Sequence, residues 1–395
     1  MSSRDVVCLS HLPWTYALER PHQVMRRFAR DRQVFFVEQP TVTDAEMRTV
    51  MKTVAPNVHV VSLYVPADMG EAEVAIAHRQ CVSALAADTE RPILWVYAPD
   101  ALPAARDLES SLLVYDCVAD HAARRDATAA QRANEMDLLV RADLVLTAGT
   151  SLFEAKRAHN VSTYPLPSSV EAECFAPSVA PGATRDGLPP APDSGPRDLG
   201  KIPSPRVGFL GVIDDRVDLA LVDHVAGARP DLQLVLLGGL VGTTTWDLPD
   251  RPNVHWLGAK DNEEIARHVA TWDVAMMPYR SDAATRRAEP SGLLACVAAG
   301  KPIVSTPLDE IGTLADRGLV RVTEPERFIG AIDQALVDAR NPAATALRRL
   351  AREAVLGRTS WDRTTSAMLR LVDEAVMTRR LVAKRRESER VLRSA

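Results

Sequence analysis

The sequence predicts an α/β protein with two doubly wound parallel sheets, one in each half of the chain. Short apolar runs, typical of strands buried on both faces, alternate with longer amphipathic runs typical of helices. This alternation occurs twice, before and after a segment rich in proline and glycine. Strands that alternate with helices pair in parallel, because each helix returns the chain to the same edge of the sheet. A chain of 395 residues also exceeds one ordinary core, so two domains are expected.

In the first half, the apolar runs predict strands at 5–10, 33–38, 58–63, 92–97, 112–116 and 144–148. Helical periodicity predicts helices that begin at Arg20 and at 71–87, 131–142 and 151–159, and the segment 162–167 closes this half.

In the second half, strands are predicted at 206–211, 233–238, 254–258, 274–277, 302–305 and 319–322. Helices are predicted at 219–228, 262–271, 293–299, 325–340, 343–356 and 361–378, followed by a mostly basic tail at 379–390. Because Trp256 lies in a predicted strand, we expect it in the core.

Eight prolines and four glycines crowd the segment between the halves, a composition that cannot build a packed element. We therefore expect an N-terminal domain at 1–176, a linker at 177–204 and a second domain at 205–358. A C-terminal helix with its basic tail occupies 359–395.

Composition excludes several classes of protein. With 46% apolar and 25% charged residues the chain is typical of soluble globular proteins, and a net charge of −5 gives no overall basic field for nucleic acid. The 5 cysteines are scattered without a CxxC pair, which indicates neither a zinc site nor a disulfide framework and fits a reducing cytoplasm. No apolar run is long enough for a signal peptide or a membrane span. The basic tail leaves two interpretations open, a solvated face and weak contact with a membrane surface.

The most informative stretch joins the predicted strand 274–277 to the helix 293–299 through a charged loop. Pro290, Ser291 and Gly292 open that helix, directly after Glu289. Free backbone N–H groups at 291–293 would face an anion, and Gly292 would let the backbone approach it closely.

Glu289-Pro290-Ser291-Gly292, the small-residue helix after it and Gly300-Lys301-Pro302 resemble the donor-sugar signature of retaining GT-B glycosyltransferases. The resemblance is to the group 1, family 4-like enzymes of bacterial polysaccharide and natural-product pathways. It implies a GT-B fold: two Rossmann-like doubly wound lobes that face a cleft. It also implies sugar transfer, with retained anomeric configuration and without a metal, from a nucleoside-diphosphate sugar. The acceptor would be a polysaccharide, a lipid-linked glycan or a small natural product, and no cofactor is expected. UDP, GDP and dTDP remain open as the nucleotide.

The resemblance also implies roles for residues of the donor site. Glu289 would contact the sugar hydroxyls as a catalytic residue, and the backbone of Ser291, Gly292 and Leu293 would hold the diphosphate. The family's second glutamate, which binds the ribose, is replaced by Ala295. The alternative for Glu289 is an ordinary turn residue that complements the helix dipole.

Two more segments resemble donor-binding loops of the family. In 209–218, after Gly211, the first of two usual basic positions holds Val212 and the second holds Arg216. A guanidinium there can bind a phosphate through two hydrogen bonds. The segment 253–260 resembles the border of the nucleobase site, with Gly258 and Lys260 as candidates. Plain surface roles for Arg216 and Lys260 are the alternatives.

In the first half, Leu12-Pro13-Trp14 with Arg20-Pro21-His22-Gln23 resembles a subset of these bacterial enzymes. Acceptor-binding residues are then expected where ligands bind, at the carboxyl edge of the sheet; they are His11, Trp14, Arg20 and His22. Asp120 and His121 follow another strand at this edge and are further catalytic candidates. Their alternative role is that of caps or hydrogen-bonded polar residues.

Two other functions stay open at this point. One is a catalytically idle GT-B scaffold that binds a nucleotide or a partner, favoured by the absence of the second glutamate, at Ala295, and of the glycine-rich first loop that many relatives have. The other is a phosphorylase or a sugar epimerase on the same fold.

Overall fold

The computed structural model describes residues 4–15, 19–87, 89–106, 108–124, 127–175, 200 and 202–394. The chain divides into two compact units, each with its own sheet. The first consists of Met1–Trp14, Arg20–Pro167 and Asp362–Ala395, and the second of Thr15–Glu19 and Ser168–Trp361. Most of the predicted linker 177–204 lies outside the described residues, at 177–199 and 201.

The strands of the first unit are β1 (Val6–Leu9), β2 (Val34–Val37), β3 (Thr41–Thr43), β4 (Arg48–Ala55), β5 (Val58–Pro66), β6 (Ile93–Val96), β7 (Leu112–Cys117), β8 (Leu144–Thr147) and β9 (Thr163–Pro165). Its helices are α1 (Arg20–Phe28), α2 (Glu71–Ala87), α3 (Leu102–Ala105), α4 (Ala129–Arg141), α5 (Thr150–Lys156) and most of α14 (Trp361–Ser394), with 3-10 turns η1 (Pro99–Ala101) and η2 (His121–Ala123).

The sheet of the first unit has the order β3-β5-β2-β1-β6-β7-β8-β9. β1 pairs in parallel with β2 on one side and with β6 on the other. The topological switch point of this sheet therefore lies between β1 and β6. β1, β6, β7 and β8 are buried along their whole length, which explains their continuous apolar runs. The predicted doubly wound parallel sheet is confirmed for this unit.

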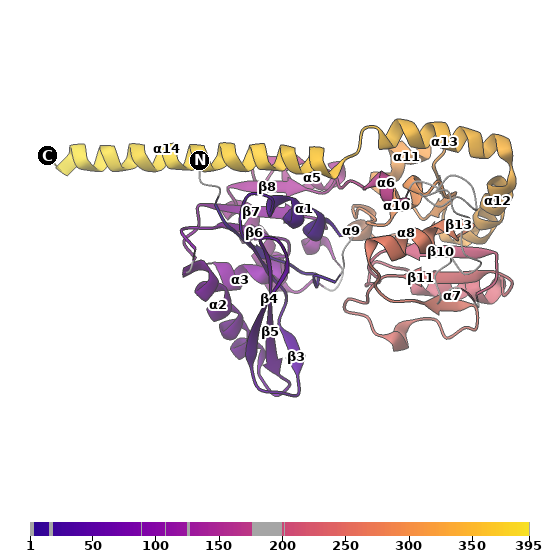
Figure 1. The fold of residues 1–395 in the computed structure, drawn as a ribbon, viewed down its shortest axis with the longest axis horizontal. Coiled ribbons are helices and arrows are strands. Elements are labelled where there is room, and N and C mark those ends of the chain that lie inside the picture. Colours follow the sequence, from indigo (N-terminus) through magenta and orange to yellow (C-terminus); the bar gives the residue numbers. More distant parts are fainter. Residues whose placement is uncertain are drawn as a thin grey trace. The chain divides into compact units, whose positions relative to one another are not determined.

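The edge of this sheet carries a hairpin that the sequence analysis missed. β4 pairs antiparallel with β5, and nearly all of its residues are exposed (Figure 1). β4 has no buried face, so its sequence, RTVMKTVA, lacks the apolar alternation from which a strand can be recognised.

The helix α14 runs without a break to Ser394, so the predicted end of a helix at residue 378 was wrong (Figure 1). Met368 and Val372 of α14 are fully buried, and Arg379 pairs with Asp143 of the first unit at 2.7 Å. The prediction ended the helix before the mostly basic tail at 379–390, but basic residues are good helix formers, and the helix continues through them.

The strands of the second unit are β10 (Arg206–Leu210), β11 (Gln233–Leu237), β12 (Val254–Trp256), β13 (Val274–Met277), β14 (Ile303–Ser305) and β15 (Val320–Val322). Its helices are α6 (Ala172–Phe175), α7 (Leu219–Ala228), α8 (Asn262–Ala270), α9 (Ala283–Arg286), α10 (Leu293–Ala298), α11 (Gly312–Asp316), α12 (Phe328–Arg340) and α13 (Pro342–Leu356). Three 3-10 turns complete it: η4 (Thr245–Asp247), η5 (Asp309–Ile311) and η6 (Pro325–Arg327).

This second sheet has the order β12-β11-β10-β13-β14-β15, and all its pairs are parallel. The order is that of a Rossmann-type sheet, with its topological switch between β10 and β13. Ligands of such sheets bind beyond the carboxyl ends of the strands at the switch, because the two crossovers leave a crevice there. A ligand site is therefore expected beyond the carboxyl ends of β10 and β13, after Leu210 and after Met277.

Candidate functional site

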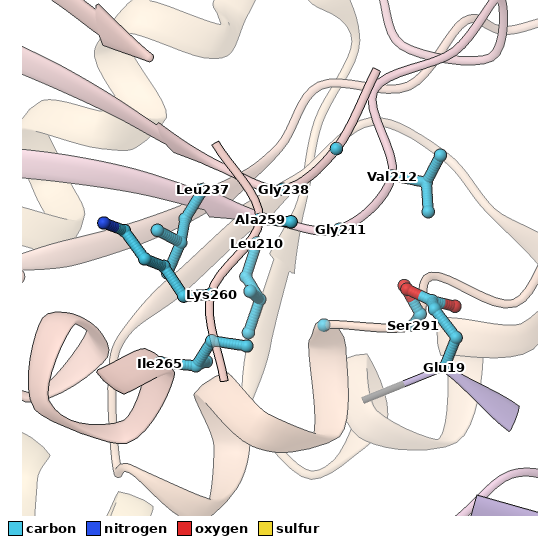
Figure 2. A pocket seen from close by; sticks show the side chains of 12 residues that line it. Glu19, Leu210, Gly211, Val212, Leu237, Gly238, Ala259, Lys260, Ile265 and Ser291 are labelled. Carbon is cyan, nitrogen blue, oxygen red and sulfur yellow. The ribbon is translucent and has the colours of Figure 1, made fainter. Parts of the chain in front are cut away.

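A pocket lies at this switch point in the second unit. Its empty volume is about 390 Å³, part of it open to solvent. Its walls come from the ends of β10 and β11, the loop after β12, the start of α8 and the turn before α10 (Figure 2). Four residues predicted from the sequence line it together: Gly211, Lys260, Ser291 and Gly292. The polar residues Glu19 and Ser291 lie on the opposite side of the pocket from Lys260 and Ile265 (Figure 2).

Backbone packing at this pocket explains two of its glycines. A Cβ on Gly292 would lie 2.0 Å from the carbonyl oxygen of Leu210, and a Cβ on Gly238 would lie 1.8 Å from that of Gly211. Both distances are far inside van der Waals contact, so any side chain would push the three loops apart. The loops after β10, β11 and β13 therefore meet backbone to backbone. Two of their amides are used in this packing: the N–H of Gly211 donates to the carbonyl of Leu237 at 3.1 Å, and the N–H of Gly238 donates to the carbonyl of Gly258 at 3.0 Å.

The turn before α10 offers fewer amides than predicted. The N–H of Leu293 donates to the carbonyl of Pro290 at 3.0 Å, and the Leu293 side chain is buried. The prediction that this amide faces an anion was therefore wrong, because the turn itself consumes it. Within the described part of the chain, the N–H groups of Ser291 and Gly292 have no such acceptor.

Arg216 is held by a carboxylate of its own loop. Its Nε lies 2.9 Å and its Nη2 2.8 Å from Oδ2 of Asp214. Burial works against its charge, but Asp214 beside it raises the pKa of Arg216 overall. The backbone of Arg216 also accepts from the N–H of Arg280 at 2.8 Å, which ties the loop after β10 to the loop after β13. Arg216 does not line the pocket, so a phosphate role requires its guanidinium to leave Asp214.

Glu289 lies just before this turn, also outside the pocket lining. Its Oε1 accepts a hydrogen bond from the backbone N–H of Ser168 at 3.1 Å, and the side chain is half-buried. A carboxylate in this position is restrained by backbone and keeps a solvent-accessible side.

The segment after β12 turns through a left-handed backbone conformation at Gly258. Gly258 has a φ of 72°, and its carbonyl accepts from the N–H of Gly238 at 3.0 Å. Lys260 follows and lines the pocket. Trp256 is 38% exposed and its indole N–H donates to the carbonyl of Gly238 at 2.9 Å, so the expectation of a core position was wrong. β12 is an edge strand, and none of its three residues is fully buried.

Glu19 is a charged residue of the pocket that was not recognised from the sequence. Its carboxylate lies beside the side chain of Ser291 (Figure 2), from which it accepts a hydrogen bond. It also lies within electrostatic reach of Arg216 and Asp214. Burial raises the pKa of Glu19, as does Asp214, whereas Ser291 and Arg216 lower it. The sequence shows only a carboxylate one residue before a helix, where it resembles a cap, and carries no sign of a contact across 272 positions (291 − 19).

In the first unit, two of the four predicted acceptor residues, Trp14 and His22, pack against each other, and a third, Arg20, is buried. Trp14 packs edge-on against Phe36 with ring centroids 4.9 Å apart. The ring centroid of His22 lies 5.2 Å from the ring centroid of each of these two residues. His22 is fully buried and its Nε2 is 2.8 Å from the carbonyl of Pro13. Arg20 is buried against Asp116, with Nε 2.9 Å from Oδ1.

These contacts favour a role in shaping the loop after β1. His11 lies at the carboxyl end of β1, half-buried, with its ring 6.1 Å from that of Tyr97. Among the four, His11 and Trp14 keep exposed surface at the edge of the sheet where ligands of such folds bind.

Asp120 and His121 belong to a loop that a buried ion cluster supports. The Lys156 ammonium lies 2.7 Å from Oδ1 of Asp120 and 2.9 Å from Oε1 of Glu135. Glu135 also accepts from the hydroxyl of Tyr115 at 3.0 Å and from the N–H of Ala122 at 2.6 Å. Asp120 is thus a buried partner of Lys156, whereas His121, half-buried in η2, remains at the sheet edge.

Two features are absent from the described residues. No group of three His, Cys, Asp or Glu side chains among them is arranged to hold a metal ion. None of the helices in the described part of the chain is both long and apolar enough to cross a membrane.

Solved structures with the same architecture identify the fold. Sucrose-phosphate synthase from Thermosynechococcus elongatus superposes with a TM-score of 0.71 over 95% of this chain and 100% of its own, at 16% identity. The Anabaena protein HepE, in complex with UDP and glucose, gives 0.65 over 94% and 100%, at 13% identity. An Escherichia coli protein of the trehalose-6-phosphate type, bound to UDP-2-fluoro glucose, gives 0.61 over 94% and 99%, at 10% identity.

The chain has the GT-B fold. The GT-B resemblance predicted from the sequence is thereby confirmed for both Rossmann-like units. No family model matches the sequence.

A curated relative matches part of this GT-B chain. The putative teichuronic acid biosynthesis glycosyltransferase TuaH of Bacillus subtilis is 28% identical over 136 residues. The match spans 33% of this chain and about a third (34%) of the length of TuaH.

Proposed function

We propose that the chain is a retaining glycosyltransferase whose donor, a nucleoside-diphosphate sugar, binds in the pocket of the second unit. The observation that carries this proposal is the pocket itself, at the switch point of a GT-B sheet and walled by the backbone of Gly211, Gly238 and Gly292. Nucleotide phosphates are held by such glycine-walled turns because backbone N–H groups reach them without side chains in the way.

The two sides of the pocket suit the two ends of a nucleotide. Leu237 and Ile265 give one side an apolar surface on which a base can pack, next to Lys260. Ser291 gives the other side a hydroxyl, and Ser291 and Gly292 give it backbone amides for the diphosphate. The proposed orientation is therefore base toward Ile265 and phosphates toward Ser291 (Figure 2).

The proposed catalytic contribution of the second unit comes from Glu289. A carboxylate close to the sugar stabilises the positive charge that develops as the glycosidic bond breaks, and this stabilisation is larger in the transition state than in the ground state. The leaving diphosphate would be stabilised by the amides of Ser291 and Gly292. His121 and His11 are the proposed contacts of the first unit with the reacting sugar or the acceptor.

UDP-glucose is the first donor to test, because HepE binds UDP and glucose and another relative binds UDP-2-fluoro glucose. A growing polysaccharide is the first acceptor class to test, because TuaH is named for teichuronic acid biosynthesis. Both assignments are proposals for this chain.

The discriminating experiment is a binding panel. UDP, GDP, dTDP and ADP are titrated into the protein while its melting temperature is followed, since a ligand of the native state raises it by mass action. One of these nucleotides should raise the melting temperature. The nucleoside-diphosphate sugar that contains the same nucleotide should raise it as well. No shift with any nucleotide would contradict the proposal.

One observation favours a second candidate, a GT-B scaffold without catalysis. Val212 supplies no charge and Arg216 is engaged by Asp214, so within the described residues no arginine lines the phosphate side of the pocket. Nucleotide binding without donor turnover in the same preparation would support this alternative.

A further inference from the structure

We propose that Glu19 occupies the diphosphate end of the pocket and competes with the ligand for it, so that this residue sets the affinity of the site. The proposal rests on the proposed function for the identity of the ligand, but the competition for an anion can be tested by itself.

The first observation is the position of Glu19 within the second unit. Residues Thr15–Glu19 group with this unit, although Trp14 before them and Arg20 after them belong to the first. The Glu19 side chain lines the pocket together with Ser291 and Gly292, which are the groups proposed to receive phosphate. Figure 2 shows its carboxylate beside Ser291.

The second observation is chemical likeness between the carboxylate and the expected ligand. Two carboxylate oxygens accept hydrogen bonds in the same way as phosphate oxygens. The Ser291 side chain already donates to Glu19, so a phosphate that needs this hydroxyl must replace the carboxylate.

The third observation is the local charge. Arg216, a cation within electrostatic reach of Glu19, is paired with Asp214 at an Nη2–Oδ2 distance of 2.8 Å. With Glu19 in place, the formal charges of Arg216, Asp214 and Glu19 add to a net negative charge. An arriving diphosphate therefore meets repulsion until the carboxylate moves away, and when it does, Arg216 loses one of its two acidic neighbours.

Rotation of the Glu19 side chain away from Ser291 would vacate the site. The ligand-free state is self-occupied, and the apparent affinity is reduced by the fraction of molecules in which Glu19 covers Ser291.

The test uses the full chain and inorganic pyrophosphate as the probe, followed by calorimetric titration. Glu19→Gln removes the charge and keeps the shape, and Glu19→Ala removes both. Both variants should bind pyrophosphate roughly tenfold more tightly than the wild type, because the competent state is no longer opposed by the carboxylate. Glu263→Gln makes the same charge change at an exposed position of α8 and should bind as the wild type does.

A second set of titrations with UDP, GDP, dTDP and ADP separates this inference from the proposed function. Equal or weaker pyrophosphate binding by both Glu19 variants overturns the inference, and so does equal affinity of wild type and variants for a nucleotide that binds. Tighter pyrophosphate binding by the variants, with no nucleotide bound by any of them, would keep the inference and reject the nucleotide site. Melting curves of each variant confirm that it is folded before it is titrated.

Discussion

At the scale of single residues, Glu289 is the strongest catalytic candidate because its geometry is set by backbone. The N–H of Ser168 fixes one carboxylate oxygen, and the turn into α10 follows directly. A group that is held in place before the reaction costs little to reorganise when charge develops beside it.

Glu289→Gln keeps the side-chain shape and one acceptor oxygen but removes the charge. We expect turnover of the donor to fall by about 10²-fold or more, within the range seen when an electrostatic stabiliser is lost. The affinity for the bare nucleoside diphosphate should stay unchanged, because the amides at the pocket, and not Glu289, receive the phosphates. Steady-state kinetics and calorimetry on the same preparation measure both quantities. A variant with wild-type turnover and a slightly lower melting temperature would show that Glu289 only complements the helix dipole.

Arg216 separates a structural role from a ligand-binding role. If its guanidinium exchanges Asp214 for a phosphate, Arg216→Ala should weaken nucleoside-diphosphate binding by about 1.5–3 kcal/mol, the worth of a charge-assisted hydrogen bond. Arg251→Ala is the matched control, since Arg251 pairs with Asp223 at 2.7 Å in the same unit without lining the pocket. Equal affinities of the two variants, together with lower stability of Arg216→Ala alone, would limit Arg216 to joining the loops after β10 and β13.

At the scale of elements, the loop after β7 depends on charges buried behind it. The Lys156 ammonium on α5 faces two carboxylates, Asp120 and Glu135, and the side chains of all three are at most 7% exposed. Buried charges of this kind contribute little as a pair but cost much when one partner is removed.

Lys156→Met should therefore destabilise the first unit by about 3–5 kcal/mol, because two carboxylates remain buried without their cation. Arg157→Met, at the next residue, breaks an exposed pair with Glu154 and should change the free energy of unfolding by less than about 1 kcal/mol. Urea unfolding of both variants measures the difference. Similar values for the two would mean that the cluster is hydrated and does not hold the loop.

The pH dependence of this effect has a definite sign. Burial works against the Lys156 ammonium, but Cys117, Glu135 and Asp120 raise its pKa above the ordinary value of 10.5. A raised pKa in the folded state stabilises the protein at pH values below the pKa of the unfolded state, and this stabilisation is lost as the pH rises through the folded pKa. The stability difference between wild type and Lys156→Met should therefore be constant near neutral pH and shrink above about pH 10.5.

Strands and helices with a buried face were predictable from the sequence, and those without one were not. β1, β7 and β13 are wholly buried, so their apolar runs reveal them. The exposed β4 shows no such pattern, and the end of α14 is stabilised by helix-forming residues that also occur in tails. An element can therefore be predicted from the sequence where its buried face leaves a pattern of apolar residues.

The site was predictable to the extent that local backbone chemistry defines it. Gly211, Ser291 and Gly292 lie in turns that can be recognised from their residue types. In the structure all three line one pocket. Glu19 reaches the same pocket through tertiary contacts alone, and the pairing of Arg216 with Asp214 depends on side-chain conformation. Neither the position of Glu19 in the pocket nor this ion pair can be recognised from the spacing of residues in the sequence.

At the scale of the whole molecule, two Rossmann-like units of the GT-B type divide the proposed work. In the proposed reaction, the second unit would bind the nucleotide in its pocket and supply Glu289, and the first would supply His11 and His121. The proposed reaction needs both, since the nucleotide pocket alone accounts for binding but for no acceptor.

The most direct test of this account is to incubate the full chain with UDP-α-glucose, or the α-linked sugar of whichever nucleotide binds, and to follow the sugar product by NMR. The account predicts release of nucleoside diphosphate and a product whose anomeric carbon is first observed in the α configuration. The same reaction with Glu289→Gln should be slower by about 10²-fold. A product of inverted configuration, or no release of nucleoside diphosphate from any sugar whose nucleotide binds, would contradict it.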